Sequence, residues 1–138
     1  MRPGEEPIRI AAAVIVGDDG RTLLVRKRGT GAFMQAGGKI GPGESAARAL
    51  TRELREELGC EVASGLRSLG RFSAPAANEA GRTVEAELFA VVLAGEIAIG
   101  AEIEELVWLD PAAPGATMLA PLTRDHVLPL VRALRTDR

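Results

Sequence analysis

The stretch that most constrains the fold is residues 38–60, where a glycine-rich loop runs directly into a strong helical pattern. Glycine suits a loop that needs positive φ or a close approach of the backbone to a ligand. Ser45 or Glu44 could accept hydrogen bonds from the free N–H groups of the first helical turn. Gly59 fits the position just past a helix end. The sequence therefore predicts a loop and then a helix that ends at Gly59, and the loop glycines are Gly37, Gly38, Gly41 and Gly43.

At about 100° per residue, the side chains of this helix separate into three faces. One face carries the acids Glu53, Glu56 and Glu57. The neighbouring stripe is apolar and consists of Ala47, Leu50, Leu54 and Leu58. The remaining side is basic and consists of Arg48, Arg52 and Arg55. Because the apolar stripe packs the helix onto a core, the acids are expected at the edge of a cleft rather than facing open water.

Three carboxylates this close repel one another unless a cation or a basic partner offsets their charge. Arg52 could pair with Glu56 one turn away, which would leave the acids as a solvated charged face. That pairing covers one acid and leaves two. Hard divalent cations such as Mg²⁺ take carboxylate and carbonyl oxygens and keep substrate phosphates as further ligands. From the residues alone, a metal site and a solvated face are both open.

The same segment resembles a known family motif. Gly38, Glu44 and the run Arg52-Glu53-Leu54-Arg55-Glu56-Glu57-Leu58-Gly59-Cys60 look like the Nudix box of the Nudix hydrolases. Cys60 replaces the usual aliphatic residue, but free cysteine behaves as a small hydrophobe. Upstream, Phe33-Met34-Gln35-Ala36-Gly37-Gly38-Lys39-Ile40 is similar to the family's lead-in strand and turn. There Ala36 stands where proline is common and Gly41 where an acid is common, which affects loop stiffness and charge more than chemistry.

The order of the expected elements suggests an α/β domain with a mixed β-sheet. The resemblance implies the specific version, a Nudix-type α/β/α sandwich in which the box forms a loop-helix-loop. The strands are expected at residues 8–16 and 22–27 (a hairpin through the turn at 17–20), 33–36, 61–73 with a bend, and 83–93. An acid-rich segment at 102–109 and a closing helix at 122–134, which contains Pro129 and His126, follow.

The resemblance also implies a reaction, the hydrolysis of a diphosphate linkage in a nucleoside diphosphate derivative with Mg²⁺ (or Mn²⁺) and water. By motif position, Glu56 and Glu57 would ligate the cation together with the Gly37 carbonyl. Glu53 would be a further ligand or the base that takes a proton from the attacking water. Arg52 would orient these acids, and Glu44 would fix the loop. The implied catalytic set is Glu53, Arg52 and Glu56, and the implied metal set includes Gly37, Glu53, Glu56 and Glu57.

Nudix enzymes often recruit another carboxylate from outside the box. The candidates are Glu85 with Glu87 on the strand at 83–93, and the cluster Glu102, Glu104 and Glu105. Glu85 is favoured, since its face continues to Phe89 and Val91 and so passes from polar surroundings into a core. An acid at such a boundary is better explained by a partner cation than by solvation alone.

Substrate contacts are expected on both sides of the box. Arg26 or Arg28 could meet the anionic tail of the substrate, although consecutive bases also suit a solvated strand end. In the turn at 74–81, Asn78 and Glu79 are the only side chains able to read a ligand by hydrogen bonds, and a plain polar hairpin tip is the alternative. The predicted substrate-binding set also contains Phe33, Gly38 and Lys39.

Nothing inside the box selects the group joined to the nucleotide. A nucleoside triphosphate, an oxidised dNTP and an ADP-ribose-like molecule are all candidate substrates. Pro75 lies near the spacing associated with ADP-ribose hydrolases, but turns favour proline in any case. Two other classes are a non-catalytic ligand-binding or regulatory Nudix module, although the box acids are intact, and an isoprenoid-diphosphate isomerase. The isomerase would need a catalytic cysteine in the cleft, where Cys60 is poorly placed.

Composition limits the partners. The 138 residues suffice for one domain, predicted to span 1–138 with a loose N-terminal segment at 1–7. A net charge of −2 with scattered bases gives no general attraction to nucleic acid polymers or membranes. The single cysteine excludes an internal disulfide, the apolar stretch at 10–16 is too short to span a membrane, and Glu5 and Glu6 are unlike a signal peptide. The expectation is a cytoplasmic enzyme, monomer or homodimer, acting on a small-molecule nucleotide.

Overall fold

A four-stranded mixed sheet forms the centre of the structure, a computed structural model that describes residues 6–136. Its strand order is β3-β1-β6-β5, and only β1 and β6 run parallel. The strands span Gly37–Lys39 (β3), Ile8–Val14 (β1), Thr83–Ala90 (β6) and Arg67–Pro75 (β5). Most of the segment 1–7, predicted to be loose, lies outside the described residues.

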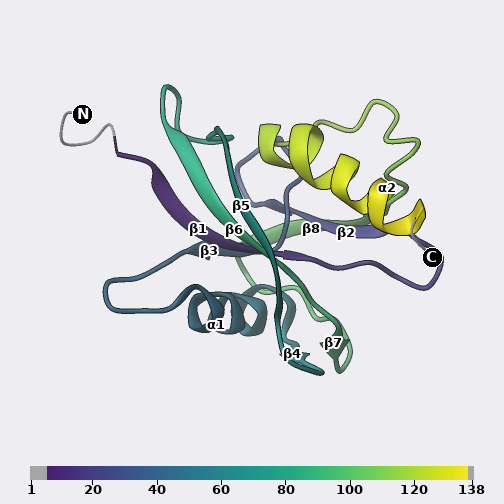
Figure 1. The fold of residues 1–138 in the computed structure, drawn as a ribbon, viewed down its shortest axis with the longest axis horizontal. Helices are drawn as coiled ribbons and strands as arrows, with labels where there is room; N and C mark the ends of the chain where they lie inside the picture. Colours follow the sequence, from purple (N-terminus) through teal and green to yellow (C-terminus); the bar gives the residue numbers. More distant parts are fainter. Residues whose placement is uncertain (1–5, 137–138) are drawn as a thin grey trace.

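Two shorter ladders flank this sheet: β2 (Thr22–Lys27) pairs with β8 (Ile103–Leu109), and β4 (Glu61–Val62) pairs with β7 (Leu93–Ala94), both antiparallel. The helix α1 (Ala46–Leu58) lies on one side of the strands, and η1 (Thr123–Val127) with α2 (Leu128–Thr136) lies on the other (Figure 1). The predicted α/β/α sandwich with a mixed sheet is therefore confirmed. Within the described residues, none of the helices has the length and hydrophobicity needed to cross a membrane.

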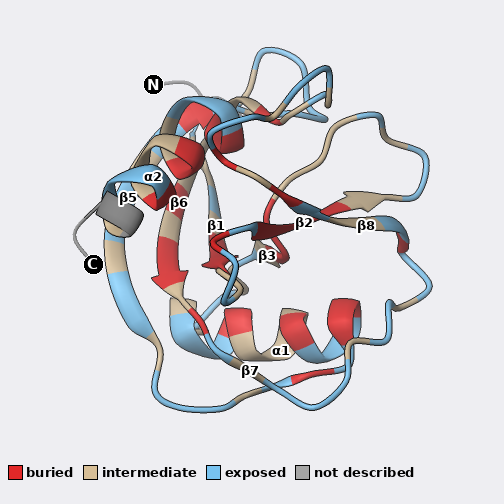
Figure 2. Ribbon diagram, turned by 90° about the vertical axis from the view of Figure 1, so that its right-hand side faces the viewer, coloured by how far each residue is buried: buried red, intermediate tan, exposed pale blue. Residues whose placement is uncertain are grey.

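The core has two main layers because the side chains of β1 alternate between the faces of the sheet. Ala11 and Ala13 pack toward α1, in a cluster that also contains Cys60. Ala12 and Val14 pack on the opposite face, toward η1 and α2. Figure 2 shows the buried side of α1 turned toward the strands. Cys60 is 1% exposed, as expected for a core residue.

The predicted hairpin between the first two strands forms only at its turn. Val16 and Thr22 form a single antiparallel bridge, and the N–H of Gly17 donates to the carbonyl of Arg21 at 2.8 Å. Beyond this bridge β1 joins β3 and β6, whereas β2 joins β8. A nearly continuous apolar strand such as β1 is stable when it is covered on both faces and paired at both edges. The hairpin prediction is corrected to two strands in different sheets.

Three other strand predictions change at their ends. The lead-in strand predicted at 33–36 forms only isolated bridges, and regular pairing begins at Gly37. The strand predicted at 83–93 stops at Ala90, and Leu93 then pairs with β4. The bend predicted within 61–73 is confirmed, since β4 and β5 are separate strands there, but β5 continues to Pro75.

The helix α1 begins and ends with the predicted caps. The hydroxyl of Ser45 accepts a hydrogen bond from the N–H of Arg48 at 3.1 Å, and Gly59 has a φ of 65°. The buried stripe is rotated from the predicted one, because Ala49 is buried and Ala47 is exposed. This rotation turns the acidic face partly inward and buries Glu57.

The loop at residues 95–102 closes the C-terminal end of α1. The N–H groups of Ala98 and Gly100 each donate at 2.9 Å, to the carbonyls of Leu58 and Glu57 respectively. These carbonyls have no partner within the helix itself. A Cβ added at Gly100 would lie only 2.1 Å from the carbonyl oxygen of Glu56. The loop is thus fixed against the helix, and it carries Glu102 to the same end.

The predicted closing helix is confirmed and contains a π-helical turn. Pro129 has no N–H and its ring clashes with the carbonyl four residues earlier in a regular helix. The N–H of Leu128 instead bonds to the carbonyl of Thr123, which widens the turn. His126 Nε2 lies 3.0 Å from the carbonyl of Ser73, in a structural position. The fully buried Thr123 is the first residue of the widened turn.

Candidate active site

Glu57 is a buried carboxylate with one oxygen left without a hydrogen bond. It is 2% exposed, and its Oε1 accepts a hydrogen bond from the N–H of Gly37 at 3.1 Å. Its Oε2 has no hydrogen-bond partner, and the nearest cation is the Lys27 Nζ at 3.9 Å. Burial raises the pKa of Glu57 to about 7, although the Gly37 hydrogen bond and Lys27 act in the opposite direction. A buried carboxylate lowers the stability of the fold unless a cation or a hydrogen-bond donor pairs with it. A strongly shifted pKa of this kind is typical of residues in functional sites.

The three acids of α1 lie at different depths. The carboxyl group of Glu53 packs against Gly38, where an added Cβ would lie 2.6 Å from its Cδ. The side chain of Glu53 is 14% exposed, whereas that of Glu56 is 58% exposed. The helix therefore presents a graded set of carboxylates, from the buried Glu57 to the solvated Glu56.

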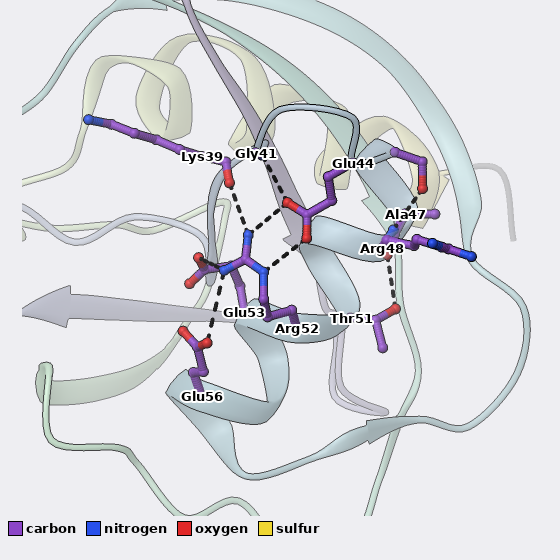
Figure 3. Close-up of polar contacts among 10 residues, drawn as sticks. Lys39, Gly41, Glu44, Ala47, Arg48, Thr51, Arg52, Glu53 and Glu56 are labelled. Atoms are coloured by element: carbon purple, nitrogen blue, oxygen red, sulfur yellow. Dashed lines mark hydrogen bonds and ion pairs between the residues drawn. The ribbon is translucent and has the colours of Figure 1, made fainter.

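Arg52 connects the acids to the glycine-rich loop (Figure 3). Its Nη1 lies 2.8 Å from the Oε1 of Glu53 and 3.9 Å from the Oε1 of Glu56. Its Nε and Nη2 donate to both oxygens of Glu44, at 3.0 and 2.9 Å. Glu44 in turn accepts from the N–H of Gly41 at 2.8 Å. These bonds give Arg52 and Glu44 the contacts that orienting the acids and fixing the loop would require.

The same bonds set the ionisation of the loop carboxylate. The hydrogen bonds from Arg52 and then from the Gly41 N–H lower the pKa of Glu44 to about 2. The Glu44 and Glu53 carboxylates raise the pKa of the Arg52 guanidinium above its usual range. Both partners thus stay charged at any physiological pH, so the loop remains attached to α1.

The donor set fits a divalent cation. Hard cations take carboxylate and carbonyl oxygens, and the buried Oε2 of Glu57 is an oxygen that needs such a partner. Within residues 6–136, no three acidic, histidine or cysteine side chains already converge as a closed cluster. The three acids of α1 do not converge because Arg52 pairs with Glu53 and Glu56, whereas Glu57 bonds to Gly37.

A cavity of about 140 Å³ begins beside Glu57. Gly37 bonds to this carboxylate and Lys27 lies near it, and both residues also line the cavity. The walls are mostly aliphatic and come from β1, β6 and the segment before η1. Polar groups include Gln35, Lys39, Asn78, Glu79 and Thr123. The predicted substrate contacts Gly38, Lys39 and Asn78 all line this cavity.

The predicted contacts Arg26, Arg28 and Phe33 do not line it. Arg26 donates to Glu105 and to the carbonyl of Thr30, and Arg28 pairs with Glu104. Phe33 packs in a small separate core with Leu24, Leu109 and Leu128. The strand has a register shift between Arg26 and Lys27, so the simple alternation behind the prediction fails there. Lys27, the residue between the two arginines, lines the cavity in their place.

Glu85, the favoured acid outside the box, lies among basic side chains. The Arg71 guanidinium, on the neighbouring strand β5, lies 3.9 Å from Glu85 and 3.0 Å from Glu87. Arg9 of β1 lies 3.7 Å from Glu87. These arginines explain the acids on that face without a metal. Glu102, by contrast, is close enough for its charge to help raise the pKa of Glu57.

Comparisons with known proteins identify the family of the chain. A model of the NUDIX domain matches residues 6–131. The chain is 33% identical over 136 residues to CTP pyrophosphohydrolase from Escherichia coli (strain K12), covering 95% of this chain and 93% of that protein. The solution structure of the E. coli ORF135 protein matches with a TM-score of 0.71 and 31% identity, over 100% of this chain and 98% of that one.

A crystal structure of a MutT NUDIX hydrolase from Burkholderia pseudomallei matches with a TM-score of 0.73 and 25% identity, over 92% of this chain and 96% of that one. The chain therefore belongs to the Nudix family. It is a Nudix hydrolase, and enzymes of this family generally use divalent metal ions.

Proposed function

We propose that this enzyme hydrolyses a nucleoside triphosphate to a nucleoside monophosphate and pyrophosphate, with Mg²⁺ (or Mn²⁺) as its cation. The observation that carries the proposal is the buried, half-unpaired carboxylate of Glu57, whose neighbours Lys27 and Gly37 line the cavity. Support for the substrate class comes from the 33% identical relative, which is a CTP pyrophosphohydrolase. Cytidine triphosphate is therefore the first substrate to test.

The chain's own residues suit this reaction. Glu56, Glu57, Glu102 and the carbonyl of Gly37 would hold the cation, which supplies charge neutralisation on the diphosphate oxygens when it is bound. Lys27 and Lys39 line the cavity and offer positive charge to phosphate oxygens.

Glu53 is the base in this proposal. Arg52 engages its Oε1, and its Oε2 lies against Gly38 at the wall of the cavity. Glu53 would accept a proton from the water whose oxygen attacks phosphorus, while the bond to the bridging oxygen breaks and pyrophosphate leaves. Arg52 keeps this carboxylate in position for the transfer.

A substrate panel tests the proposal. The purified protein is incubated with CTP, UTP, an oxidised dNTP, ADP-ribose and isopentenyl diphosphate, with Mg²⁺ and separate readouts for pyrophosphate and phosphate. We expect pyrophosphate and a nucleoside monophosphate from triphosphates, loss of activity in EDTA, and recovery with excess Mg²⁺. Turnover of ADP-ribose or isopentenyl diphosphate without turnover of any triphosphate would contradict it. No observation favours the isomerase, since Cys60 is buried and does not line the cavity.

The carboxylate outside the box gives a second, sharper test. Under this proposal Glu102→Gln lowers kcat by at least ~10-fold at fixed Mg²⁺, about 1.4 kcal/mol. Glu85→Gln is the matched control, since its carboxylate pairs with Arg71, and it should leave kcat nearly unchanged. Steady-state kinetics at several Mg²⁺ concentrations measure both. A silent Glu102→Gln together with an impaired Glu85→Gln would restore the sequence-based choice of Glu85.

A further inference from the structure

Lys27 brings an ammonium group to the buried carboxylate of α1 without forming a hydrogen bond to it. Its Nζ lies 3.9 Å from the Oε2 of Glu57, and that oxygen has no hydrogen-bond partner. Hydrogen bonds between nitrogen and oxygen are about 2.7–3.2 Å long. Lys27 thus offsets the charge of Glu57 by proximity alone. Because a buried ion pair is stabilising only when hydrogen bonds complete it, this loose contact suits a partner that can be exchanged.

The other charged groups that act on Glu57 are acids. Burial is the main cause that raises the pKa of Glu57, and the charges of Glu53 and Glu102 raise it further. The charge of Lys27 acts in the opposite direction. The N–H of Arg28 donates to the carbonyl of Glu102 at 2.8 Å, so Lys27 and Glu102 come from adjoining segments. Lys27 therefore balances acids that would otherwise repel one another in a partly buried site.

The backbone of Lys27 is fixed, whereas its side chain can move. The carbonyl of Lys27 accepts from both the N–H and the hydroxyl of Thr30, at 3.0 and 2.8 Å. The side chain is 35% exposed and lines the cavity. A flexible stem of methylene groups joins the ammonium to the backbone. The ammonium can therefore withdraw from Glu57 toward the cavity while the strand stays in place.

A divalent cation cannot reach the unpaired oxygen of Glu57 with the side chains in these positions. The Oε2 atom is closed off from solvent, so a neighbouring group has to move before a cation can bind there. Gly37 contributes only its backbone, which is held by the pairing of β3 with β1. Glu53 is held by Arg52 at 2.8 Å. Lys27 is the neighbour that has both a movable side chain and a charge that a metal ion would repel.

We propose that Lys27 is the counter-cation of Glu57 before a metal binds, and that a divalent cation must displace its ammonium in order to use this carboxylate. The inference rests on the proposed use of Glu57 as a metal ligand. The two cations cannot share the carboxylate at close range, because like charges repel strongly in partly buried surroundings. Binding of the metal therefore frees the ammonium of Lys27 for an anionic group in the cavity.

Titration with Mn²⁺, followed by the electron paramagnetic resonance of the free ion, tests the displacement. At pH 8, where Glu57 is ionised, Lys27→Met should lower the Kd for Mn²⁺ by at least ~10-fold, because no cation has to leave. Lys39→Met is the matched control, since it removes the same charge from the cavity wall. Lys39 pairs with Glu79, so its loss should leave the Kd nearly unchanged. An unchanged or higher Kd in Lys27→Met would overturn the inference.

A double-mutant cycle in EDTA at pH 8 tests the same pair without metal. Lys27→Met should lower the thermal midpoint, since Glu57 loses the cation beside it. In the Glu57→Gln background the same substitution should lower it much less, because no buried charge remains to be offset. If Lys27→Met alone fails to fold but the double variant folds, the pair is supported in the same way. Equal losses in the two backgrounds would show that Lys27 is not the counter-cation of Glu57.

Failures of the two proposals are distinguishable. If Mn²⁺ binds the unmodified protein and Lys27→Met with the same Kd, the inference about Lys27 is overturned while the proposed function stands. If Glu57→Gln binds Mn²⁺ as tightly as the unmodified protein, the proposed use of Glu57 as a ligand fails and the inference falls with it.

Discussion

Glu57→Gln should lower turnover severely and yet stabilise the metal-free protein at neutral pH. The substitution keeps an acceptor for the Gly37 N–H but removes the negative charge that the proposed cation requires. Loss of one group that stabilises developing charge typically lowers kcat by about 10²–10³-fold. We expect an effect of that size in the pyrophosphate release assay with saturating Mg²⁺.

The gain in stability follows from the sign of the pKa shift. Burial raises the pKa of Glu57 in the folded protein to about 7, from an ordinary value of 4.5. Between these values the folded protein binds a proton that the unfolded chain has released, so stability falls as pH rises through this window. The full cost, on the order of 3 kcal/mol, applies above pH ~7.

Urea denaturation in EDTA at pH 5 and pH 8 measures this dependence. The unmodified protein should lose stability between the two pH values, and Glu57→Gln should lose much less. Glu56→Gln is the matched control because Glu56 is largely exposed, and it should follow the unmodified protein. Identical pH profiles for Glu57→Gln and the unmodified protein would show that Glu57 is not an uncompensated buried acid.

Gly37→Ala is expected to damage both the fold and the site. Gly37 has a φ of 147°, and a Cβ there would lie 2.1 Å from the carbonyl oxygen of Ala11 and 2.8 Å from the Cα of Ala12. These atoms belong to β1, so the pairing of β1 with β3 must shift. We expect a loss of at least about 3 kcal/mol in the free energy of unfolding, and loss of turnover, since Gly37 holds Glu57.

Gly43→Ala provides the control for the backbone term alone. Gly43 also has a positive φ, 71°, but no atom lies within 4 Å of an added Cβ. The variant should lose about 1–2 kcal/mol and retain its turnover. Chemical denaturation and the same activity assay compare the two. Equal destabilisation by both substitutions would mean that the contact with β1 contributes nothing beyond backbone strain.

Much of the fold followed from local sequence patterns. The caps at Ser45 and Gly59 and the position of α1 depend on residues close in the chain, and these predictions were accurate. The pairing of strands was not, because β1 and β2 could satisfy their edges with several partners. In the structure β1 pairs with the distant β6, and β2 pairs with the distant β8. Local sequence patterns carry no information on which distant strands pair.

The site shows the same division. Arg52 and Glu53 were identified from the motif, and their contact is observed. A helical wheel could not give the depth of Glu57, because a small rotation of α1 exchanges Ala47 for Ala49 in the core. Lys27 was missed because the bulge after Arg26 breaks the alternation of the strand.

The docking of residues 95–102 onto the end of α1 restricts where this chain can change its length. Ala98 and Gly100 are bound to carbonyls of Leu58 and Glu57, so the number of residues up to Glu102 is fixed by geometry. An insertion between Gly100 and Glu102 would displace the carboxylate even if every other side chain stayed in place. The hydrogen bonds of the turn at Gly17 join residues 17–21 to one another and do not involve α1. Extra residues, tags or fused domains are therefore better accommodated in that turn than in the loop that follows β7.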